Sequence, residues 1–160
     1  MKLKDFVVFN PIEHLSKNCN YRKISMDQIT PFTRKVESHN IEIYKGGSKF
    51  RNGDTIFARI TPCLENGKTC FVSCLEKDEV AFGSTEFIIV RARDGISIPL
   101  FIFYLLITNH IRNKAIVSMT GSSGRERVQQ VALDNIDIPN YSLDYQQHIV
   151  NISRRVSYAS

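Results

Sequence analysis

The sequence predicts an α+β fold: a curved, mostly antiparallel β-sheet with a helical pair and a C-terminal amphipathic helix. Three observations predict this class. Short apolar runs separated by turn residues fill the first 92 positions, apolar residues recur at helical spacing after Asp94-Gly95, and helical spacing returns at the end of the chain. With 160 residues, 42% hydrophobic and 23% charged, the chain has the length and composition of one ordinary globular domain, which argues against disorder.

The expected strands lie in the first part of the chain. Apolar or alternating runs predict them at 21–24, 41–44, 54–60, 69–75, 80–82 and 87–92. Asn66-Gly67 is a strong turn pair, so 54–60 and 69–75 should form a hairpin whose connection is longer than two residues. After the first strand, Ser25 and Asp27 suit a helical turn that ends at Pro31.

The helical part begins after residue 95. Pro99 suits a helix start, and apolar side chains recur at helical spacing as far as Ile111, so a helix is expected over about 99–110. A second helical piece at 112–117 leads into a glycine-serine loop, and 127–131 is expected to be a strand.

The closing segment predicts an amphipathic helix. Ser142 is its expected N-cap, and one face carries Tyr145, Ile149, Ile152 and Val156. We therefore expect residues 1–141 to form the domain and 142–160 to begin a helix that extends from it.

Charge and hydropathy narrow the class of protein. The 21 Lys and Arg exceed the 16 Asp and Glu, a net charge of +5 that mildly favours polyanionic partners such as nucleic acids. The N-terminus lacks the apolar core of a signal peptide. The longest apolar stretch, 96–111, is interrupted by polar residues and is shorter than the roughly 20 residues of a membrane span. A soluble, cytoplasmic protein with no membrane partner is expected.

The four cysteines do not form a metal motif. Cys19, Cys63, Cys70 and Cys74 include no C-x2-C pair. On a regular strand, Cys70 and Cys74 would be about 13 Å apart, too far to share one zinc. Reduced thiols in a cytosolic protein, and no metal site, are therefore expected.

Catalytic motifs are also missing. The sequence has no phosphate-binding G-x-x-x-x-G-K-[ST] loop, no dinucleotide glycine fingerprint and no H-E-x-x-H, and its four histidines (His14, His39, His110, His148) are scattered. No Asp or Glu precedes a Lys by two residues, the spacing usual in metal-dependent nucleases. A stand-alone small DNA nuclease is kept as an alternative, but it would need a carboxylate cluster that the sequence does not suggest.

Four polar, glycine-containing loops carry cationic or amide groups: 50–54, 61–68, 83–86 and 120–127. Such groups recognise DNA, because arginine binds guanine O6 and N7, amides bind adenine, and hydroxyl, ammonium and backbone N–H groups hold phosphates. In the last loop Glu126 lies between Arg125 and Arg127, where it can orient them or accept a hydrogen bond from cytosine N4. Two other interpretations stay open: solvated turns whose arginines pair with nearby acids, and a protein- or RNA-binding module that uses the same loops.

The motifs in and around these loops resemble those of one family. Residues 53–68 (GDTIFARITPCLENGK), 82–87 (FGSTEF) and 121–128 (GSSGRERV) occur in the order found in the target-recognition domain of type I restriction–modification specificity subunits. The segment 136–139 (IDIP), followed by Gln146-Gln147 and Ile149, is similar to the family's exit into its conserved helix. The resemblance covers about residues 5 to 156, and four motifs in order make it specific.

The resemblance implies a non-catalytic subunit that recognises half of a bipartite DNA site. It also implies modification (methyltransferase) and restriction subunits as partners. Since the modification partner supplies the S-adenosylmethionine chemistry, no cofactor is expected on this chain.

We expect the DNA contacts to come from the loops that carry the motifs. Arg125 and Arg127 are the expected base or phosphate contacts, with Ser122, Ser123 and Lys68 on phosphates. Arg59, Asn66 and Thr85 are further candidates.

The end of the chain raises a separate question. The family's usual polypeptide has two such domains, each followed by a long helix, whereas a helix from Ser142 to Ser157 would be only about 24 Å long. Its apolar face is expected either to dock on its own domain or to pair with a second copy in an isologous dimer. A monomer or weak dimer is expected in isolation, and the chain is either a natural half-subunit or a fragment.

Overall fold

A computed structural model describes residues 1–159, with side chains described as far as residue 155. It confirms the α+β class and gives these elements in chain order: α1 (Leu3–Phe6), β1 (Val7–Phe9), β2 (Asn20–Ile24), the 3-10 turn η1 (Met26–Gln28), β3 (Ile41–Ile43), β4 (Ser48–Phe50), β5 (Thr55–Ala58), β6 (Thr69–Phe71), β7 (Ala81–Gly83), β8 (Phe87–Ala92), α2 (Pro99–Leu106), α3 (Asn109–Val117), α4 (Gln130–Asp134) and α5 (Leu143–Ala159).

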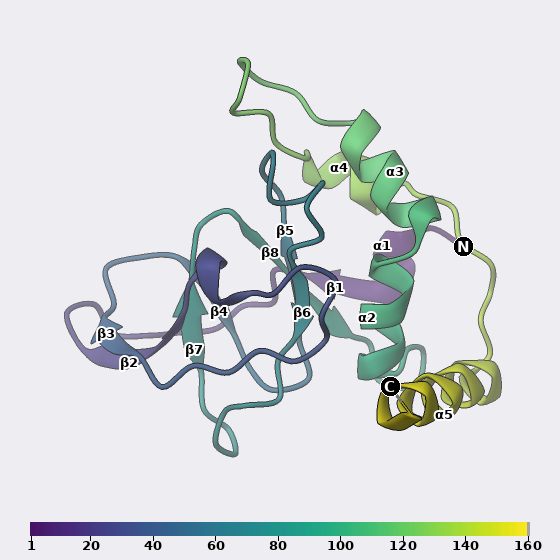
Figure 1. The fold of residues 1–160 in the computed structure, drawn as a ribbon, viewed down its shortest axis with the longest axis horizontal. Helices are drawn as coiled ribbons and strands as arrows, with labels where there is room; N and C mark the ends of the chain where they lie inside the picture. The colour runs from purple at the N-terminus through teal and green to yellow at the C-terminus, as the bar shows by residue number, and fades with distance from the viewer. Residues whose placement is uncertain (160) are drawn as a thin grey trace.

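The strands divide between two four-stranded sheets. The first has the order β1-β8-β5-β6 and is antiparallel throughout. The second has the order β3-β2-β7-β4, with β2 and β7 parallel and the other neighbours antiparallel. The second sheet lies on one side of the first, and the helices lie on the other (Figure 1).

The first sheet is the central layer because both of its faces are buried. Side chains alternate between the faces of a strand. In β5, Phe57 joins the core beneath the helices, while Ile56 joins the core that faces the second sheet. In β8, Ile88 and Ile89 divide in the same way, which explains why the first four residues of this strand, 87–90, are all apolar.

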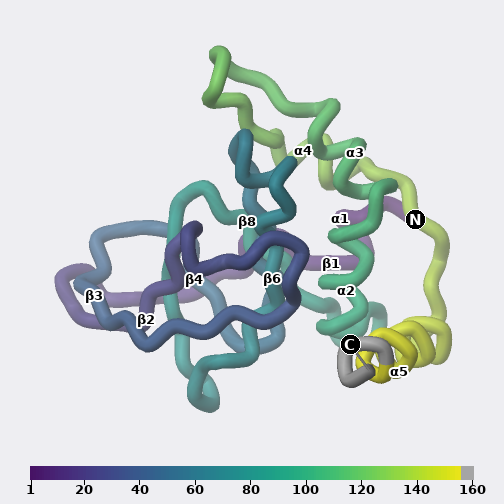
Figure 2. The backbone as a smooth tube through the Cα atoms, viewed as in Figure 1, coloured from purple at the N-terminus to yellow at the C-terminus, as the bar shows by residue number. Residues whose placement is uncertain are grey.

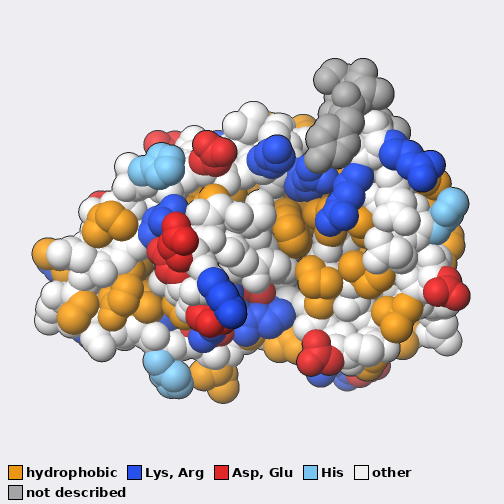
Figure 3. Space-filling model, turned by 90° about the horizontal axis from the view of Figure 1, so that it is seen from below, with side chains coloured by type: hydrophobic (Ala, Val, Ile, Leu, Met, Phe, Trp, Pro, Cys, Tyr) orange, Lys and Arg blue, Asp and Glu red, His pale blue; other side chains and the backbone are white. Residues whose placement is uncertain are grey.

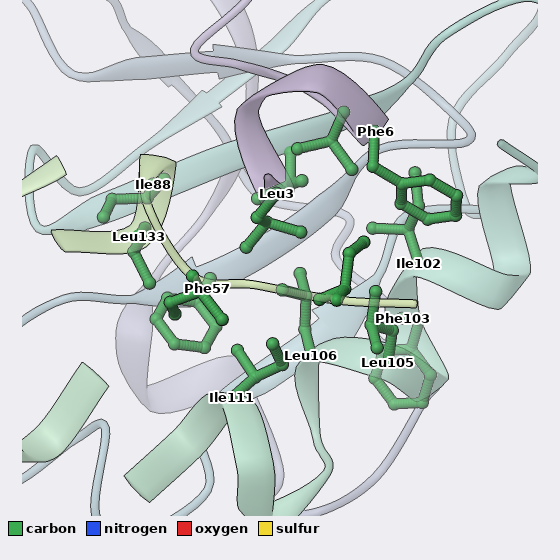
Figure 4. Close-up of a cluster of buried hydrophobic side chains, with 14 of the residues drawn as sticks. Leu3, Phe6, Phe57, Ile88, Ile102, Phe103, Leu105, Leu106, Ile111 and Leu133 are labelled. Atoms are coloured by element: carbon green, nitrogen blue, oxygen red, sulfur yellow. The ribbon is translucent and has the colours of Figure 1, made fainter. Parts of the chain in front are cut away.

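The larger core gathers around α2. Six of the eight residues of α2 are buried, so this helix is covered on nearly all sides. Figure 4 shows side chains from α1, β5, β8, α2, α3 and α4 pointing toward one another in this cluster. The N-terminal segment is bound to the same body, since Leu3 N donates to Ile136 O at 2.8 Å.

Two local predictions between residues 99 and 131 differ from the structure. The helix expected over 99–110 ends at Leu106, because Thr108 caps a new helix, α3, with its hydroxyl accepting from Ile111 N. The strand expected at 127–131 is wrong. Arg127 makes only isolated bridges, and the short helix α4 begins at Gln130.

The closing helix has the expected N-cap, since Ser142 Oγ accepts from Tyr145 N at 3.1 Å. Its docked face differs from the expected one. The buried positions are Gln146 and Val150, whereas Tyr145 and Ile152 are 47% and 43% exposed. Ile149 is half-buried, and the side chain of Val156 lies outside the described residues.

Gln146 fixes α5 to the rest of the fold. Its side chain accepts from Ile98 N and donates to Ile96 O and Tyr141 O. Because Ile98 is the N-cap residue of α2, α5 docks beside the start of that helix. Figures 1 and 2 show α5 at the end of the molecule away from β3. None of the helices in the described part is long and apolar enough to cross a membrane.

Candidate nucleic-acid interface

Three of the four polar loops meet at one end of the central sheet. We name them the β5–β6 loop (59–68), the β7–β8 turn (84–86) and the α3–α4 loop (118–129). Arg59 lies between the other two segments, because its N–H donates to Glu86 O at 2.9 Å and its carbonyl accepts from Val128 N at 2.8 Å. Thr61 N also donates to Glu126 O at 3.0 Å. Figure 1 shows the α3–α4 loop projecting from the body at this end.

The fourth loop, 50–54, lies elsewhere. It precedes β5, whereas the β5–β6 loop follows it, so the two lie at opposite ends of that strand. Its charges are used internally: Arg51 pairs with Glu13 at 2.6 Å, and Asp54 pairs with Arg91 at 2.7 Å. This loop therefore lies apart from the other three.

Arg127 is held by a carboxylate from another loop. Its Nε and Nη2 donate to the carboxylate of Glu86 at 2.8 to 3.0 Å, and its Nη1 donates to Arg125 O at 3.1 Å. The hydrogen bond from Arg127 lowers the pKa of Glu86, with the positive charges of Arg127 and Arg59 acting in the same direction and burial opposing them. Glu86 is therefore ionised at neutral pH.

The outer part of the α3–α4 loop is exposed. Ser122, Ser123 and Arg125 are all open to solvent, and Arg125 N donates to Ser122 O at 2.9 Å. Gly121 has φ +131°, and a Cβ there would lie 3.0 Å from Arg125 O, so the turn requires glycine. Glu126 accepts from Gly124 N and pairs with neither arginine, so the carboxylate that orients Arg127 is Glu86.

The β5–β6 loop presents an amide and an ammonium group. Asn66 is exposed at the turn, and the half-buried Lys68 donates from Nζ to Met26 O at 3.1 Å. Gly67 has φ +78°, and its Cα faces the ring of Phe32, leaving no room for a side chain. The hydroxyl of Thr61 donates to the carboxylate of Glu65, which closes the turn on itself.

Thr85 and Arg59 occupy different environments. Thr85 is exposed and lines a hollow of about 370 Å³ together with Lys23 and Gly46. Arg59 is half-buried, and its Nε has no hydrogen-bond partner among the described residues. Its positive charge helps to lower the pKa of Glu86, although the hydrogen bonds to that carboxylate come from Arg127.

Two residues that hold this end together, Arg112 and Phe32, were not among the predicted site residues. Arg112, on α3, donates from Nη2 to Leu64 O and Glu65 O at 3.3 and 3.0 Å, and its guanidinium lies 4.8 Å from the ring centre of Phe32. Phe32 N in turn donates to Gly67 O at 2.9 Å. No local pattern marks either residue, because each acts on a loop more than 30 positions away.

The end with the loops differs from the opposite face. Figure 3 views the molecule from that opposite face, where several Lys and Arg side chains gather toward one edge and Asp and Glu are scattered among apolar groups elsewhere. At the loops, the carboxylates of Glu65, Glu86 and Glu126 each have at least one oxygen bonded to a neighbour, whereas Arg125 keeps an exposed guanidinium.

The cysteines and acidic residues show no metal-binding arrangement. The four cysteines are free, and burial raises the pKa of Cys70 to about 12, so its thiol stays protonated. Within residues 1–159, no three His, Cys, Asp or Glu side chains come together as ligands for one ion.

Comparisons with known proteins identify the relatives of this chain. No family model matches. The chain is 32% identical over 109 residues to the type I restriction enzyme EcoAI specificity subunit of Escherichia coli, which is 68% of this chain and 18% of that protein. It is 37% identical over 101 residues to the EcoEI specificity subunit of the same species, which is 61% of this chain and 16% of the relative.

Solved structures share the fold. The HsdS subunit from Thermoanaerobacter tengcongensis matches 99% of this chain with a TM-score of 0.76 and 20% identity. A chain from a structural study of complex assembly and conformational transition of the type I restriction–modification system matches equally well, at 19% identity. This chain covers 43% and 42% of those two chains, less than half of each. The sequence matches and the shared fold together show that the chain belongs to the specificity-subunit family of type I restriction–modification systems.

Proposed function

We propose that the chain recognises one half of a bipartite target in double-stranded DNA. In this proposal it directs the modification and restriction subunits of a type I system to that site. The observation that carries the proposal is the meeting of three loops at one end of the central sheet, which brings all eight candidate contact residues onto three backbone segments. The family supports DNA recognition as the task of such a surface.

The contacts divide by chemistry. Exposed hydroxyls and backbone N–H groups at the tip of the α3–α4 loop, from Ser122 and Ser123, suit phosphate oxygens, and the ammonium of Lys68 suits a nearby phosphate. The exposed amide of Asn66 has the donor and acceptor pair that matches adenine N6 and N7. Arg59 and Thr85 flank these groups and complete the candidate surface.

The proposal assigns no catalysis to this chain. A nuclease would need carboxylates free to hold metal ions beside the bound phosphate. At the loops, Glu86 is bonded to Arg127, Glu65 to Thr61 and Glu126 to the backbone of Gly124. Methyl transfer and cleavage are therefore proposed for the partner subunits, and no cofactor is proposed for this one.

We also propose a role for the closing helix. Residues 1–141 form the recognition domain in this proposal, and 142–160 begin the spacer that sets the distance to a second domain. Although α5 docks through Gln146 and Val150, Tyr145 and Ile152 remain exposed on its outer side. That strip can take a second helix, from a partner subunit or from another copy of this chain in a homodimer.

Equilibrium binding of duplex DNA at several salt concentrations tests the proposal. The chain is titrated alone and with its modification subunit. Each phosphate that the protein neutralises should steepen the plot of log K against log salt by about 0.9. Arg125→Ala should weaken all duplexes and lower the slope by about one unit if this exposed arginine holds a phosphate. Absence of binding at low salt with the partner present would refute the proposal, and cleavage of DNA by the chain alone would refute its non-catalytic part.

A further inference from the structure

The hydrogen bonds of Arg127 leave part of its guanidinium free in a defined direction. A guanidinium has five N–H groups: one on Nε and two on each terminal nitrogen. Glu86 takes the Nε–H and one N–H of Nη2, and Arg125 O takes one N–H of Nη1. Each terminal nitrogen therefore keeps one N–H that is not donated to any described residue.

A pair of N–H groups on neighbouring nitrogens is the group that binds guanine. Guanine presents O6 and N7 side by side in the major groove, and arginine donates to both at once. The side chain of Arg127 is 37% exposed, so part of it is accessible to a ligand. Arg125, in contrast, has no carboxylate partner among the described residues and is exposed, as expected of a contact to the flexible phosphate backbone.

We propose that Arg127 reads a guanine in the target and that Glu86 is the positioning residue that fixes the orientation of its guanidinium. This inference rests on the proposed function and adds one base and one pair of residues to it. Glu86 bonds two nitrogens of Arg127 simultaneously, which removes rotation about the end of the side chain before DNA binds. An arginine side chain that is ordered before DNA binds loses little conformational entropy on binding. It also cannot easily reorient to accommodate another base, so a wrong base should weaken binding more strongly.

The backbone contacts of the loops support these roles for Arg127 and Glu86. Glu86 is fixed through its own backbone, because Glu86 O accepts from Arg59 N and its N–H donates to Ser84 Oγ at 3.0 Å. Arg127 is fixed through bridges to Ile60 and Thr120. Both partners of the ion pair therefore belong to paired backbone, whereas Ser122 to Arg125 form the exposed tip beyond them.

The test begins with duplexes enriched from a randomised pool by the parent protein, with its modification subunit added if the parent requires it. Each guanine of the enriched duplex is then replaced by 7-deazaguanine, which lacks the N7 acceptor. At one position the replacement should weaken binding to the parent by about five- to tenfold, part of the discrimination of a two-bond arginine contact.

Variants identify the residue responsible. Arg127→Lys keeps the positive charge but cannot donate two parallel N–H groups. It should bind the enriched duplex more weakly, and 7-deazaguanine at that position should then have no further effect. Arg125→Lys is the matched control on the same loop and should keep the full effect. Glu86→Gln should reduce the 7-deazaguanine effect at the same guanine without weakening binding to unrelated duplexes. If Glu86 only stabilised the structure of the loop, its loss would instead weaken binding to all duplexes.

Three outcomes would overturn the inference. One is an equal 7-deazaguanine effect in the parent and in Arg127→Lys, another is an enriched site without guanine, and the third is a uniform loss over all sequences in Glu86→Gln. In each of these cases sequence-selective binding by the parent would still stand. If the parent selects no sequence at all, the proposed function itself fails, which makes the two failures distinguishable. Unfolding curves confirm that each variant is folded.

Discussion

Replacing Gln146 with alanine should loosen the attachment of α5 to the domain. The side chain of Gln146 is fully buried and makes three hydrogen bonds, all to backbone groups outside the helical repeat of α5. The distances are 2.8 Å from Ile98 N, 2.9 Å to Ile96 O and 3.1 Å to Tyr141 O. Alanine removes all three hydrogen bonds and leaves the three backbone groups without this side-chain partner.

The magnitude follows from the three bonds. A hydrogen bond contributes about 1 kcal/mol net, and a buried group left without a partner costs about 1 to 3 kcal/mol. We therefore expect Gln146→Ala to lower the free energy of unfolding by about 3 kcal/mol. With an unfolding entropy of roughly 2.1 cal/mol/K per residue, this corresponds to a fall of about 9 °C in Tm for a chain of this length.

The adjacent glutamine is the matched control. Gln147 is exposed and bonds only to Asn151 within the same helix, so Gln147→Ala should change stability by less than about 0.5 kcal/mol. Urea unfolding followed by circular dichroism measures both variants. Hydrogen exchange at the amide of Ile98 should accelerate only in Gln146→Ala. Equal stabilities of the two variants, with Ile98 equally protected, would refute this account of how α5 is attached.

Three further predictions concern single positions. The pKa of Glu13 lies below its usual 4.5, chiefly because of the hydrogen bond from Arg51. Such a carboxyl stabilises the fold above pH 4.5, and this contribution is lost as the pH falls through the pKa of the folded state. In urea unfolding measured at decreasing pH, Glu13→Gln should therefore lose less stability than the parent below about pH 4.5. Gly67→Ala should lower the free energy of unfolding by about 2 kcal/mol, because φ is +78° and the new Cβ would lie 2.6 Å from the ring of Phe32. In a double-mutant cycle, Phe32→Ala should remove the clash with the ring but not the strain of the positive φ. Strictly additive effects of the two substitutions would contradict this explanation. Gly121→Ala should weaken DNA binding several-fold while Tm falls by only about 3 °C, because the loop tip must move away from Arg125 O; unchanged affinity in the salt titration would count against the tip as a contact surface.

Local signals in the sequence predicted much of the fold. Pro99 begins α2 and Ser142 caps α5, as expected from the preferences of those positions. The turn pair Asn66-Gly67 lies between β5 and β6, and Gly67 has the positive φ that such turns require. These features are set by a few neighbouring residues, so they can be predicted without knowledge of the fold.

Pairing between distant segments could not be predicted in this way. β1 is three residues long and pairs with β8 more than 80 positions later, and β2 pairs in parallel with β7 across about 60 positions. The expected strand at 127–131 failed for a different reason. Val128 lies before α4 and is buried, whereas Val131 lies within α4 and is 64% exposed, so the two valines do not belong to one buried strand.

The same limit applies to the candidate site. The composition of the loops identified them as candidate contact segments. It could not show at which end of a strand each loop lies, so loop 50–54, which precedes β5, was grouped with loops at the other end of that strand. The sequence offered Glu126, next to Arg127, as one residue that could orient it, whereas the carboxylate bonded to Arg127 is that of Glu86, 41 positions away. A neighbouring charge in sequence is a weak guide, since residues one position apart in an extended loop point in different directions.

Hydrogen exchange of the protein with and without a duplex that it enriches tests the central claim most directly. Backbone amides in the β5–β6 loop, the β7–β8 turn and the α3–α4 loop should exchange more slowly in the complex. Amides of β3 and of loop 50–54, which lie away from the meeting point of the three loops, should be unaffected. Protection at β3 or at 50–54, with the three loops unchanged, would contradict the claim that these loops form the DNA-reading surface.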